Sequence, residues 1–531
     1  MALWLRDIPL EWGEDPACLP LKVGRMLGID PVRLRNFRVI RRSLDARRKP
    51  RLLQVFTVEF GVDDEAAALL QHSGNTRLQP AIETSVPSRL PIGSPHRALV
   101  VGMGPAGLFA ARHLAECGVQ VTLLERGRPV ERRIRDVEHF WSTGELNPES
   151  NVQFGEGGAG TFSDGKLSTR LNHPWLRHVL LLLVACGAQE EILVDARPHI
   201  GTDRLRLVLI RFREQLRALG VELRYESCLT GFEMAAGKVS AGIVNGAGLV
   251  PCESLILAPG HSARDTYRML DDSGVALEPK GFAVGVRVEH PRELIDRIQY
   301  GQCHPADVPA ADYALRYNDA ESGRGVYSFC MCPGGEVINA ASQAGALVVN
   351  GMSRANRGGA CSNSALVVTV RPADWPGGGV LGGVAFQRQL EEAAFRSGGG
   401  GFIAPAQNLM TFGGRGRGRV GQSSCRPGVR EADLAEFLPD FVTVGLKRAL
   451  PHFERQMRGF MTAEALLIGV ETRTSAPLRI VRNEHGESIS HPGLFPAGEG
   501  AGYAGGIMSA ALDGLKVAEQ ILQRLRERES Q

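Results

Sequence analysis

The sequence predicts an α/β fold: a Rossmann-like βαβ domain with a β-meander, an inserted α+β domain and a small N-terminal α+β domain. Three features of the chain lead to this prediction. A glycine-rich turn joins a short apolar run to a helical pattern, a group of short strands follows, and an apolar strand with a glycine-opened helix closes the chain. Strands that alternate with helical patterns are typical of a parallel sheet.

The βαβ unit is predicted at residues 98–125. An apolar run is followed by the motif GMGPAG, by a helical pattern and by a second apolar run that ends at Glu125. Gly102 permits a tight turn, Gly104 lets a pyrophosphate approach the backbone, and Gly107 allows the helix to pack closely on the strand. The helix N-terminus offers free N–H groups to the phosphates. Glu125, eighteen residues after Gly107, is placed to bind ribose hydroxyls, so the unit predicts a dinucleotide site.

The composition limits the class of protein. A chain of 531 residues is expected to hold two or three domains, and its formal charge of +3 indicates no strongly charged partner overall. The longest apolar stretch, 179–185, is too short to cross a membrane, and acidic residues near the N-terminus argue against a signal peptide. Ten scattered cysteines without a CxxC pair indicate reduced thiols. We therefore expect a cytoplasmic protein with no membrane partner.

Residues 1–90 are predicted to form the N-terminal domain. Apolar alternation and helical spacing indicate strands and helices in an order that suggests a ferredoxin-like layer. The strands are expected at 2–5, 37–44 and 52–60, and the helices at 19–27 and 64–71. Residues 74–96, rich in Ser, Pro and Thr, predict a linker.

A run of basic residues lies around the two middle strands of this domain, opposed by Asp45. It is open to two interpretations: a solvated hairpin, or a surface that binds RNA or phosphate. The near-absence of aromatic residues among the charges favours the hairpin. The run comprises Arg33, Arg35, Arg38, Arg41, Arg42, Arg47, Arg48, Lys49 and Arg51.

Changes of pattern after the βαβ unit predict the remaining domains. Residues 174–220 indicate helices, and strands at 223–227, 238–244 and 248–251 predict an antiparallel meander. The apolar segment 254–261 is expected to return to the parallel sheet beside its first strand. We expect the dinucleotide-binding domain at 97–280 and 491–531, and an inserted substrate domain at 281–490 with strands at 282–288, 325–329 and 365–370. The basic glycine run at 413–419 follows no predicted strand, so we reject it as a second fingerprint.

Two observations favour FAD over NAD as the bound dinucleotide. Strand ends at Gly260 and at Gly498–Glu499 lie far from the fingerprint in sequence, and an extended cofactor needs such remote contacts. A second glycine-opened helix, at 505–511, is placed to stabilise the negative charge of a reduced flavin. The predicted FAD contacts are Gly102, Gly104, Pro105, Ala106, Gly107, Glu125, Arg126, Gly260, Gly498, Glu499, Gly506 and Ile507. With one convincing fingerprint, NADH or NADPH is expected only as a transient reductant.

Several segments carry a family resemblance. LLERG, LILAPGH and LFPAGEGAGYAGGI are similar to segments of the glutathione-reductase-type two-dinucleotide-binding flavoprotein fold. Together with NVQFGEGGAGTFSDGKL, SFCMCPGGEV, NGMS, NSALVVTV and GVETRTSAPLRI, they make nearly the whole chain resemble a family of FAD-dependent dehydrogenase-like proteins of unassigned substrate. The resemblance implies bound FAD and implies no substrate. Glu499 departs from the broader fold, in which an Asp commonly contacts the ribitol or pyrophosphate side of the flavin.

Candidate catalytic residues lie on glycine-rich turns. The segment 154–170 carries five glycines between positions 155 and 165, and we interpret it as a loop in contact with the cofactor rather than a flexible surface loop. Within it, Lys166 is suited to stabilise a reduced flavin or a substrate anion, and Asp164 to act as a base, although both also fit an exposed turn. Arg473 is suited to bind a substrate carboxylate or phosphate, or to pair with a neighbouring or distant acid. His261 is a minor acid–base candidate.

Cys330 and Cys332 form a CxC motif with two possible roles. A dithiol beside a flavin can run thiol–disulfide exchange, but a CxC disulfide closes a strained ring, so packing or substrate contact is favoured. No histidine follows at metal-ligand spacing, and no metal site is predicted.

The sequence thus leads to three hypotheses. The favoured one is an FAD-dependent oxidoreductase that acts on an unidentified small molecule by hydride or electron transfer to the flavin. The second is an RNA-associated flavoprotein that uses the basic N-terminal domain. The third is a non-catalytic FAD-binding protein.

Overall fold

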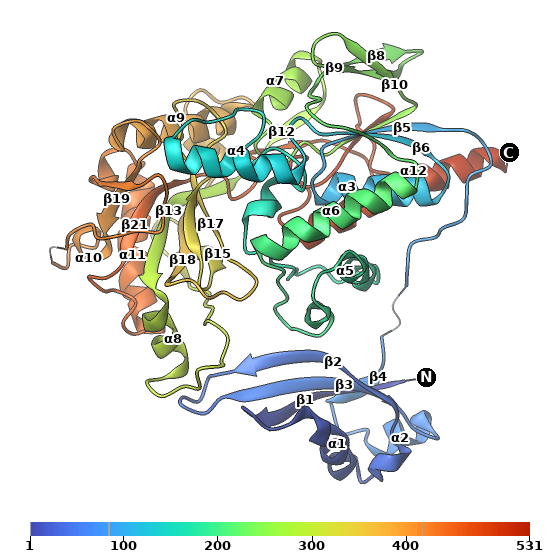
Figure 1. Cartoon of the computed structure of the whole chain (residues 1–531), viewed down its shortest axis with the longest axis vertical. Coiled ribbons are helices and arrows are strands. Elements are labelled where there is room, and N and C mark those ends of the chain that lie inside the picture. Colours follow the sequence, from blue (N-terminus) through green and yellow to red (C-terminus); the bar gives the residue numbers. More distant parts are fainter. Residues whose placement is uncertain (1, 83–84, 417, 531) are drawn as a thin grey trace.

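The computed structural model describes residues 2–82, 85–416 and 418–530. It has a mixed α/β architecture in which three larger sheets are each covered by helices (Figure 1). Among the described residues, no helix combines the length and the apolar character that crossing a membrane requires.

The N-terminal sheet has the strand order β2-β3-β1-β4, with two helices on the face turned away from the rest of the chain (Figure 1). Its strands are antiparallel, and the element order βαββαβ is that of a ferredoxin-like unit. The elements are β1 (Leu3–Glu11), α1 (Leu19–Leu27), β2 (Arg35–Asp45), β3 (Leu53–Gly61), α2 (Glu65–Gln71) and β4 (Leu78–Pro80). Apolar side chains of β1 and β3 pack against α1 and α2 in one core.

The strand β4 corrects one expectation. It lies within 74–96, the segment predicted to be a linker, and pairs antiparallel with β1. This short strand forms only because it pairs with β1, which is distant in sequence. The local composition does not reveal that pairing.

The parallel sheet has the order β23-β11-β5-β6-β7. Its strands are β5 (Arg97–Val101), β6 (Gln120–Leu124), β7 (Glu222–Arg224), β11 (Ser254–Leu257) and β23 (Leu494–Pro496). Alternation along β5 decides what covers each face. Ala98 and Val100 pack in the cluster of the helices, whereas Leu99 and Val101 pack in the cluster of the meander. As predicted, the strand after the meander returns beside β5 in parallel.

The helices over this sheet are α3 (Pro105–Glu116), α4 (Val130–Thr143), α5 (Leu176–Ala185), α6 (Thr202–Ala218), α7 (Arg264–Asp272) and α12 (Ile507–Glu529). The helices α3 and α12 pack so closely that a Cβ on Gly514 would lie 2.0 Å from the Ala106 carbonyl oxygen. The C-terminal helix is therefore fixed against the helix of the βαβ unit.

The strands that form the meander differ from those predicted. It consists of β8 (Leu229–Ala235), β9 (Lys238–Val244) and β10 (Gly248–Pro251), in antiparallel order. The segment 223–227, expected in the meander, contributes instead to β7, which pairs in parallel with β6. The sequence of a short strand does not indicate which strand it pairs with, because parallel and antiparallel pairs accept the same side chains.

The inserted region is built on a sheet with the order β14-β15-β18-β13-β21-β19-β20, antiparallel except for the pair β19–β20. Its strands are β13 (Phe282–Pro291), β14 (Arg316–Asp319), β15 (Arg324–Cys332), β18 (Cys361–Val370), β19 (Ala404–Asn408), β20 (Val429–Glu431) and β21 (Leu466–Glu471). The small sheets β12 (Leu277–Pro279) with β22 (Leu478–Ile480) and β16 (Glu336–Asn339) with β17 (Val349–Met352) flank it. The helices are α8 (Arg292–Tyr300), α9 (Gly382–Ser397), α10 (Leu409–Phe412) and α11 (Asp440–Gln456).

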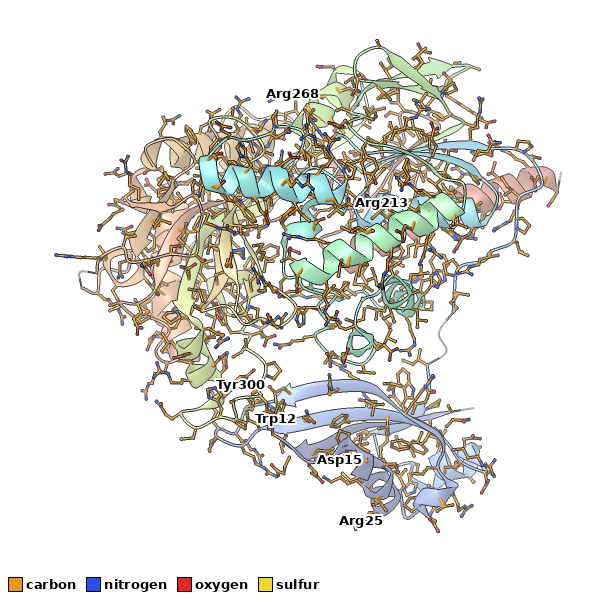
Figure 2. All side chains as sticks on the ribbon, in the orientation of Figure 1. Trp12, Asp15, Arg25, Arg213, Arg268 and Tyr300 are labelled. Carbon is orange, nitrogen blue, oxygen red and sulfur yellow. The ribbon has the colours of Figure 1, made fainter. Side chains whose placement is uncertain are left out.

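The N-terminal unit contacts the rest of the chain at its hairpin. Arg42 forms an isolated parallel bridge with Asp195 and a salt bridge to its carboxylate at 2.7 Å. Trp12 packs against the hydrophobic cluster that contains Tyr300 of α8, and both side chains lie at this boundary (Figure 2). The hairpin is thus part of an internal interface.

Most of the basic run is engaged with acidic or carbonyl partners. Arg33 and Arg35 pair with Asp63, Arg38 with Glu59, Arg47 with Asp45 and Arg51 with Glu11, while Lys49 donates to the Ile298 carbonyl. This pairing agrees with the interpretation as a hairpin. Binding of RNA to the run stays a prediction.

Candidate cofactor and substrate site

One cavity of about 370 Å³ lies between the carboxyl ends of the parallel strands and the inserted sheet. The fingerprint loop, the glycine-rich segment after residue 154, the ends of β11 and β23 and the start of α12 line one part of it. Residues of β15 and β21 line the other part. Ligand sites of α/β sheets occur at this edge.

The predicted FAD contacts converge on this cavity. Those that line it are Gly102, Gly104, Pro105, Ala106, Glu125, Arg126, Gly260, Gly498, Glu499, Gly506 and Ile507. Gly107 does not line it, in agreement with its assigned packing role: a Cβ there would lie 1.9 Å from the Gly102 carbonyl oxygen.

The other two glycines of the fingerprint have different roles. Gly102 has φ +100°, and a Cβ on it would lie 2.2 Å from the Ala258 carbonyl oxygen at the end of β11. A Cβ on Gly104 would meet no described atom within 4 Å, although the residue lines the cavity. Bare backbone thus faces the cavity at the N-terminus of α3, where a pyrophosphate is bound in folds of this type.

Glu125 is held by backbone N–H groups. Its Oε2 accepts from Met103 at 2.9 Å, and its Oε1 accepts from Gly127 and Gly155, each at 2.9 Å. A carboxylate has about four acceptor sites, so capacity remains for a ribose hydroxyl. Arg126, next in sequence, pairs with Glu149 and Asp265 and lies 4.1 Å from the centre of the Phe154 ring.

Arg133 of α4 holds the glycine-rich segment in place, and its side chain is fully buried. Arg133 donates to the carbonyl oxygens of Asn151, Val152, Gly155 and Glu156. The segment is therefore held in place and is not a flexible surface loop. Sequence reasoning missed this clamp, although an arginine on the apolar face of an amphipathic helix is a usable signal.

Glu156 ties the same segment to α6. Its carboxylate accepts from Arg213 at 3.0 Å, from the Tyr225 hydroxyl at 2.8 Å and from the Val130 amide at 2.8 Å. Arg213 projects from α6 toward α4 (Figure 2), where it also pairs with Glu131.

Glycines of the C-terminal segment line the cavity at the start of α12. Gly506 caps α12 with φ +138°, and Asp513 accepts from the Gly498 amide at 2.7 Å. Glu499 lines the cavity, and burial raises its pKa to about 7. Its longer side chain therefore introduces a carboxyl group that gains or loses a proton near neutral pH.

Asp164 and Lys166 lie together in the cavity with a third partner that sequence reasoning did not find. Arg357 binds both oxygens of Asp164, at 3.0 and 2.6 Å, and the Lys166 Nζ lies 2.8 Å from Asp164 Oδ2. Burial alone would raise the pKa of Asp164, but Lys166 and Arg357 hold it below the usual range. Asp164 is thus poorly suited to the predicted role of base, because it holds a proton weakly.

Arg473 lines the cavity, but its donors are engaged. Its guanidinium binds both oxygens of Glu391, at 3.0 and 2.9 Å, and donates to Ser262 and Ser342. Arg264 binds the same carboxylate. Of the two roles weighed for Arg473, the structure shows the ion pair with a distant acid. Direct binding of a substrate anion stays a prediction.

His261 also lines the cavity, and its ring contacts the Ser262 hydroxyl at 2.9 Å. Burial, with the nearby Arg473 and Arg264, lowers the pKa of His261 to about 4. The ring is therefore neutral at physiological pH.

Cys330 and Glu471 face the cavity from the inserted sheet, and Arg287 connects them. The Arg287 Nη2 donates to the Cys330 carbonyl at 2.6 Å, and its Nε lies 3.4 Å from Glu471 Oε2. Glu471 is 3% exposed, and its Oε2 has no hydrogen-bond partner among the residues that the structure describes. Burial raises the pKa of Glu471 to about 7. Sequence reasoning missed Glu471 as a site residue because its role depends on burial.

The described residues fit FAD. Bare glycine backbone at Gly104 and Gly506, a carboxylate with spare acceptor capacity at Glu125 and two helix N-termini all border one elongated cavity. Gly104 and the N-terminus of α3 would hold the pyrophosphate, Glu125 the adenosine ribose, and Gly506 with the N-terminus of α12 the flavin ring.

Comparisons with known proteins agree with this fit. Residues 96–136 match a family model described as an FAD binding domain, and residues 281–474 match one described as FAD-dependent protein, C-terminal domain-like. Residues 7–61 match a domain of unknown function. An uncharacterized protein of Clostridium beijerinckii is 44% identical over 529 residues, 99% of each chain. The chain belongs to this family of FAD-dependent proteins.

Solved structures resemble this FAD-dependent protein only weakly. A flavin-dependent brominase has a TM-score of 0.36 at 12% identity, with 81% of each chain covered. A geranylgeranyl bacteriochlorophyll reductase-like protein of Thermoplasma acidophilum has a TM-score of 0.36 at 14% identity, with 82% of this chain and 83% of that chain covered. Likenesses at this level carry no information about the reaction.

Proposed function

We propose that the chain is an FAD-dependent oxidoreductase that acts on a small molecule by hydride or electron transfer to the flavin. The observation that carries this proposal is the continuity of the cavity. It extends from the dinucleotide fingerprint at Gly104 and Glu125 to a cluster of ionisable groups at Lys166, Cys330 and Glu471. FAD supplies the redox chemistry when bound, and the protein supplies orientation and electrostatics.

Lys166 is the cation that supports the proposal. Its Nζ lies 2.8 Å from Asp164, and it donates to the Met331 carbonyl at the edge of β15. Burial disfavours the charged ammonium, but attraction to the negative charge shared by the Cys332–Cys330 pair and to Asp164 raises the pKa of Lys166, so the charge persists at neutral pH. A positive charge fixed in this position stabilises a reduced flavin or an anionic substrate.

Glu471 is a better base than Asp164 in this proposal. Its pKa of about 7 matches the range in which a carboxylate both accepts and returns protons efficiently. Asp164 then acts as a positioning residue, since it holds Lys166 and Arg357 in one cluster. NADH or NADPH, if it reduces the flavin, binds transiently in the cavity, because the sequence has one dinucleotide fingerprint.

The proposal is tested by the absorbance spectrum of the purified protein, followed by anaerobic addition of NADH, then of NADPH. We expect flavin bands that bleach with one of the nicotinamides. In Lys166→Met the bleaching is expected to slow by about 10- to 100-fold, whereas Lys238→Met, on the meander strand β9, serves as the matched control. Flavin bands that no nicotinamide or metabolite mixture bleaches would favour a non-catalytic FAD-binding protein.

A further inference from the structure

The CxC motif of β15 lies at a break in the strand. Cys330 has φ +45°, and the register of β15 against β18 shifts between Phe329 and Cys332. In a regular strand, residues i and i+2 lie about 6.6 Å apart, which is near the upper limit for a disulfide. At the kink, the Cys332 Sγ donates to the Cys330 carbonyl oxygen at 3.4 Å.

Two cationic side chains bind backbone carbonyl groups at this break in β15. Arg287, which is fully buried, donates to the Cys330 carbonyl, and Lys166 donates to the carbonyl of Met331, between the two cysteines. Reactive cysteines occupy electropositive and partly accessible environments of this kind. Cys330 is partly exposed and lines the cavity, whereas Cys332 is fully buried behind it.

The two thiols are electrostatically unequal. A side-chain hydrogen bond between the two sulfurs, distinct from the contact with the Cys330 carbonyl, lowers the pKa of Cys330 to about 5 against the effect of burial, and Lys166 and Arg287 add to the lowering. The same hydrogen bond and burial raise the pKa of Cys332 well above its usual value. The pair thus carries one thiolate at neutral pH, and Cys330 is the member that lines the cavity, where a substrate can reach it.

A third group completes the site. Glu471 faces the same cavity with an oxygen that has no hydrogen-bond partner in the described part of the chain. An acceptor left without a partner in a buried site costs free energy. Because this oxygen is buried 3.4 Å from the Arg287 Nε and burial raises the pKa of Glu471 to about 7, the carboxyl group is suited to take up and release a proton within the site.

We propose that Cys330 and Cys332 form a redox-active dithiol whose substrate is a low-molecular-weight disulfide bound in the cavity. Because the pair borders the cavity assigned to FAD, this assignment rests on the proposed oxidoreductase function and names its substrate class.

The exchange needs no outside oxidant. The Cys330 thiolate attacks one sulfur of the substrate disulfide, forms a mixed disulfide and releases one substrate thiolate. Cys332 gives its proton to that thiolate, with Glu471 as the carrier, and then attacks the Cys330 sulfur. The Cys330–Cys332 bond forms, the second substrate thiolate leaves, and the substrate has gained the two electrons that the dithiol lost. FAD, when bound, supplies a two-electron couple beside the oxidised pair.

The test uses the full-length protein and the aromatic disulfide 5,5′-dithiobis(2-nitrobenzoate), whose thiolate is coloured. We expect a fast phase that releases two thiolates per wild-type chain, with peptide mapping that shows a Cys330–Cys332 disulfide. Cys332→Ser is expected to release one and to retain a mixed disulfide at Cys330. Cys330→Ser is expected to lose the fast phase. Cys303→Ser, which removes an exposed thiol, is the matched control and keeps the phase.

The pH dependence separates Cys330 from an ordinary thiol. At pH 6 a thiolate of pKa about 5 is ionised roughly 300-fold more than a thiol of pKa about 8.5, but its lower nucleophilicity leaves a net advantage of roughly 10-fold. The fast phase should change little between pH 6 and 8, over which an ordinary thiol accelerates roughly 80-fold.

Two failures are distinguishable. If the protein binds no flavin or its flavin cannot be reduced, the proposed oxidoreductase function fails whatever the thiols do. If the flavin is reduced normally but Cys330 reacts like an ordinary thiol and no Cys330–Cys332 disulfide is found, the dithiol assignment alone is overturned.

Discussion

Replacing Gly104 by alanine is expected to weaken FAD binding by about 10- to 100-fold while the chain stays folded. A Cβ at this position meets no described protein atom within 4 Å, so the methyl group costs the apoprotein little. The same methyl would stand beside the N-terminus of α3, where the pyrophosphate must approach the backbone. Overpacking of a close contact costs about 1–3 kcal/mol, which corresponds to this loss of affinity. Titration of apoprotein with FAD, followed by flavin fluorescence, measures the effect.

Two further glycine variants control this result. Gly74→Ala adds a methyl group in open space in the N-terminal unit and should bind FAD like the wild type. Gly107→Ala should instead destabilise the fold, because its Cβ would lie 1.9 Å from a backbone carbonyl. Unchanged FAD affinity in Gly104→Ala would contradict the assignment of the pyrophosphate to this turn.

Replacing Glu391 by alanine is expected to destabilise the chain by about 3–5 kcal/mol. Glu391 is fully buried and binds both Arg264 and Arg473, so its removal leaves two buried guanidinium groups without their counter-charge. Glu392→Ala is the matched control: it removes the neighbouring carboxylate, whose partner Arg388 is half exposed, and should change stability by less than about 1 kcal/mol. Urea unfolding of the two variants and the wild type provides the comparison.

The pH dependence of this difference has a defined sign. Burial alone would raise the pKa of Glu391, but Arg264 and Arg473 hold it below its usual range. A carboxylate whose pKa is lower in the folded state stabilises the fold fully above its unfolded pKa of about 4.3 and loses this effect as the pH falls further. The difference between wild type and Glu391→Ala should be constant from pH 6 to 8 and shrink below about pH 4. A difference that grows on acidification would contradict the pairing.

The parts of the fold that sequence predicted are those with a local pattern. The fingerprint, the helix after it and the return of 254–261 to the parallel sheet all follow from glycine positions and short apolar runs. The strands β4 and β7 were missed or misplaced because each has few residues and depends on a distant partner. Strand pairing is decided by contacts that a local window of sequence does not contain.

The residues of the candidate site also divide into those that local sequence predicted and those that it did not. Gly104 and Glu125 were predicted from the spacing of the βαβ motif and Lys166 from its place on a glycine-rich loop, and all three line the cavity. Arg357 lies 193 positions from Asp164, and Glu391 lies 82 positions from Arg473, so the pairs that decide the charge of each group could not be found by spacing. Glu471 was missed for a different reason: its significance depends on its burial beside Arg287, which the local sequence does not show.

The most direct test of the central claim compares FAD with FMN in binding to the apoprotein. The account predicts that FAD binds tightly and FMN at least about 100-fold more weakly, because FMN lacks the adenosine that Glu125 and the turn at Gly104 are placed to hold. Equal affinity for the two flavins would contradict the assignment of this end of the cavity to adenosine. Failure to bind either flavin would contradict the claim that the cavity is a flavin site.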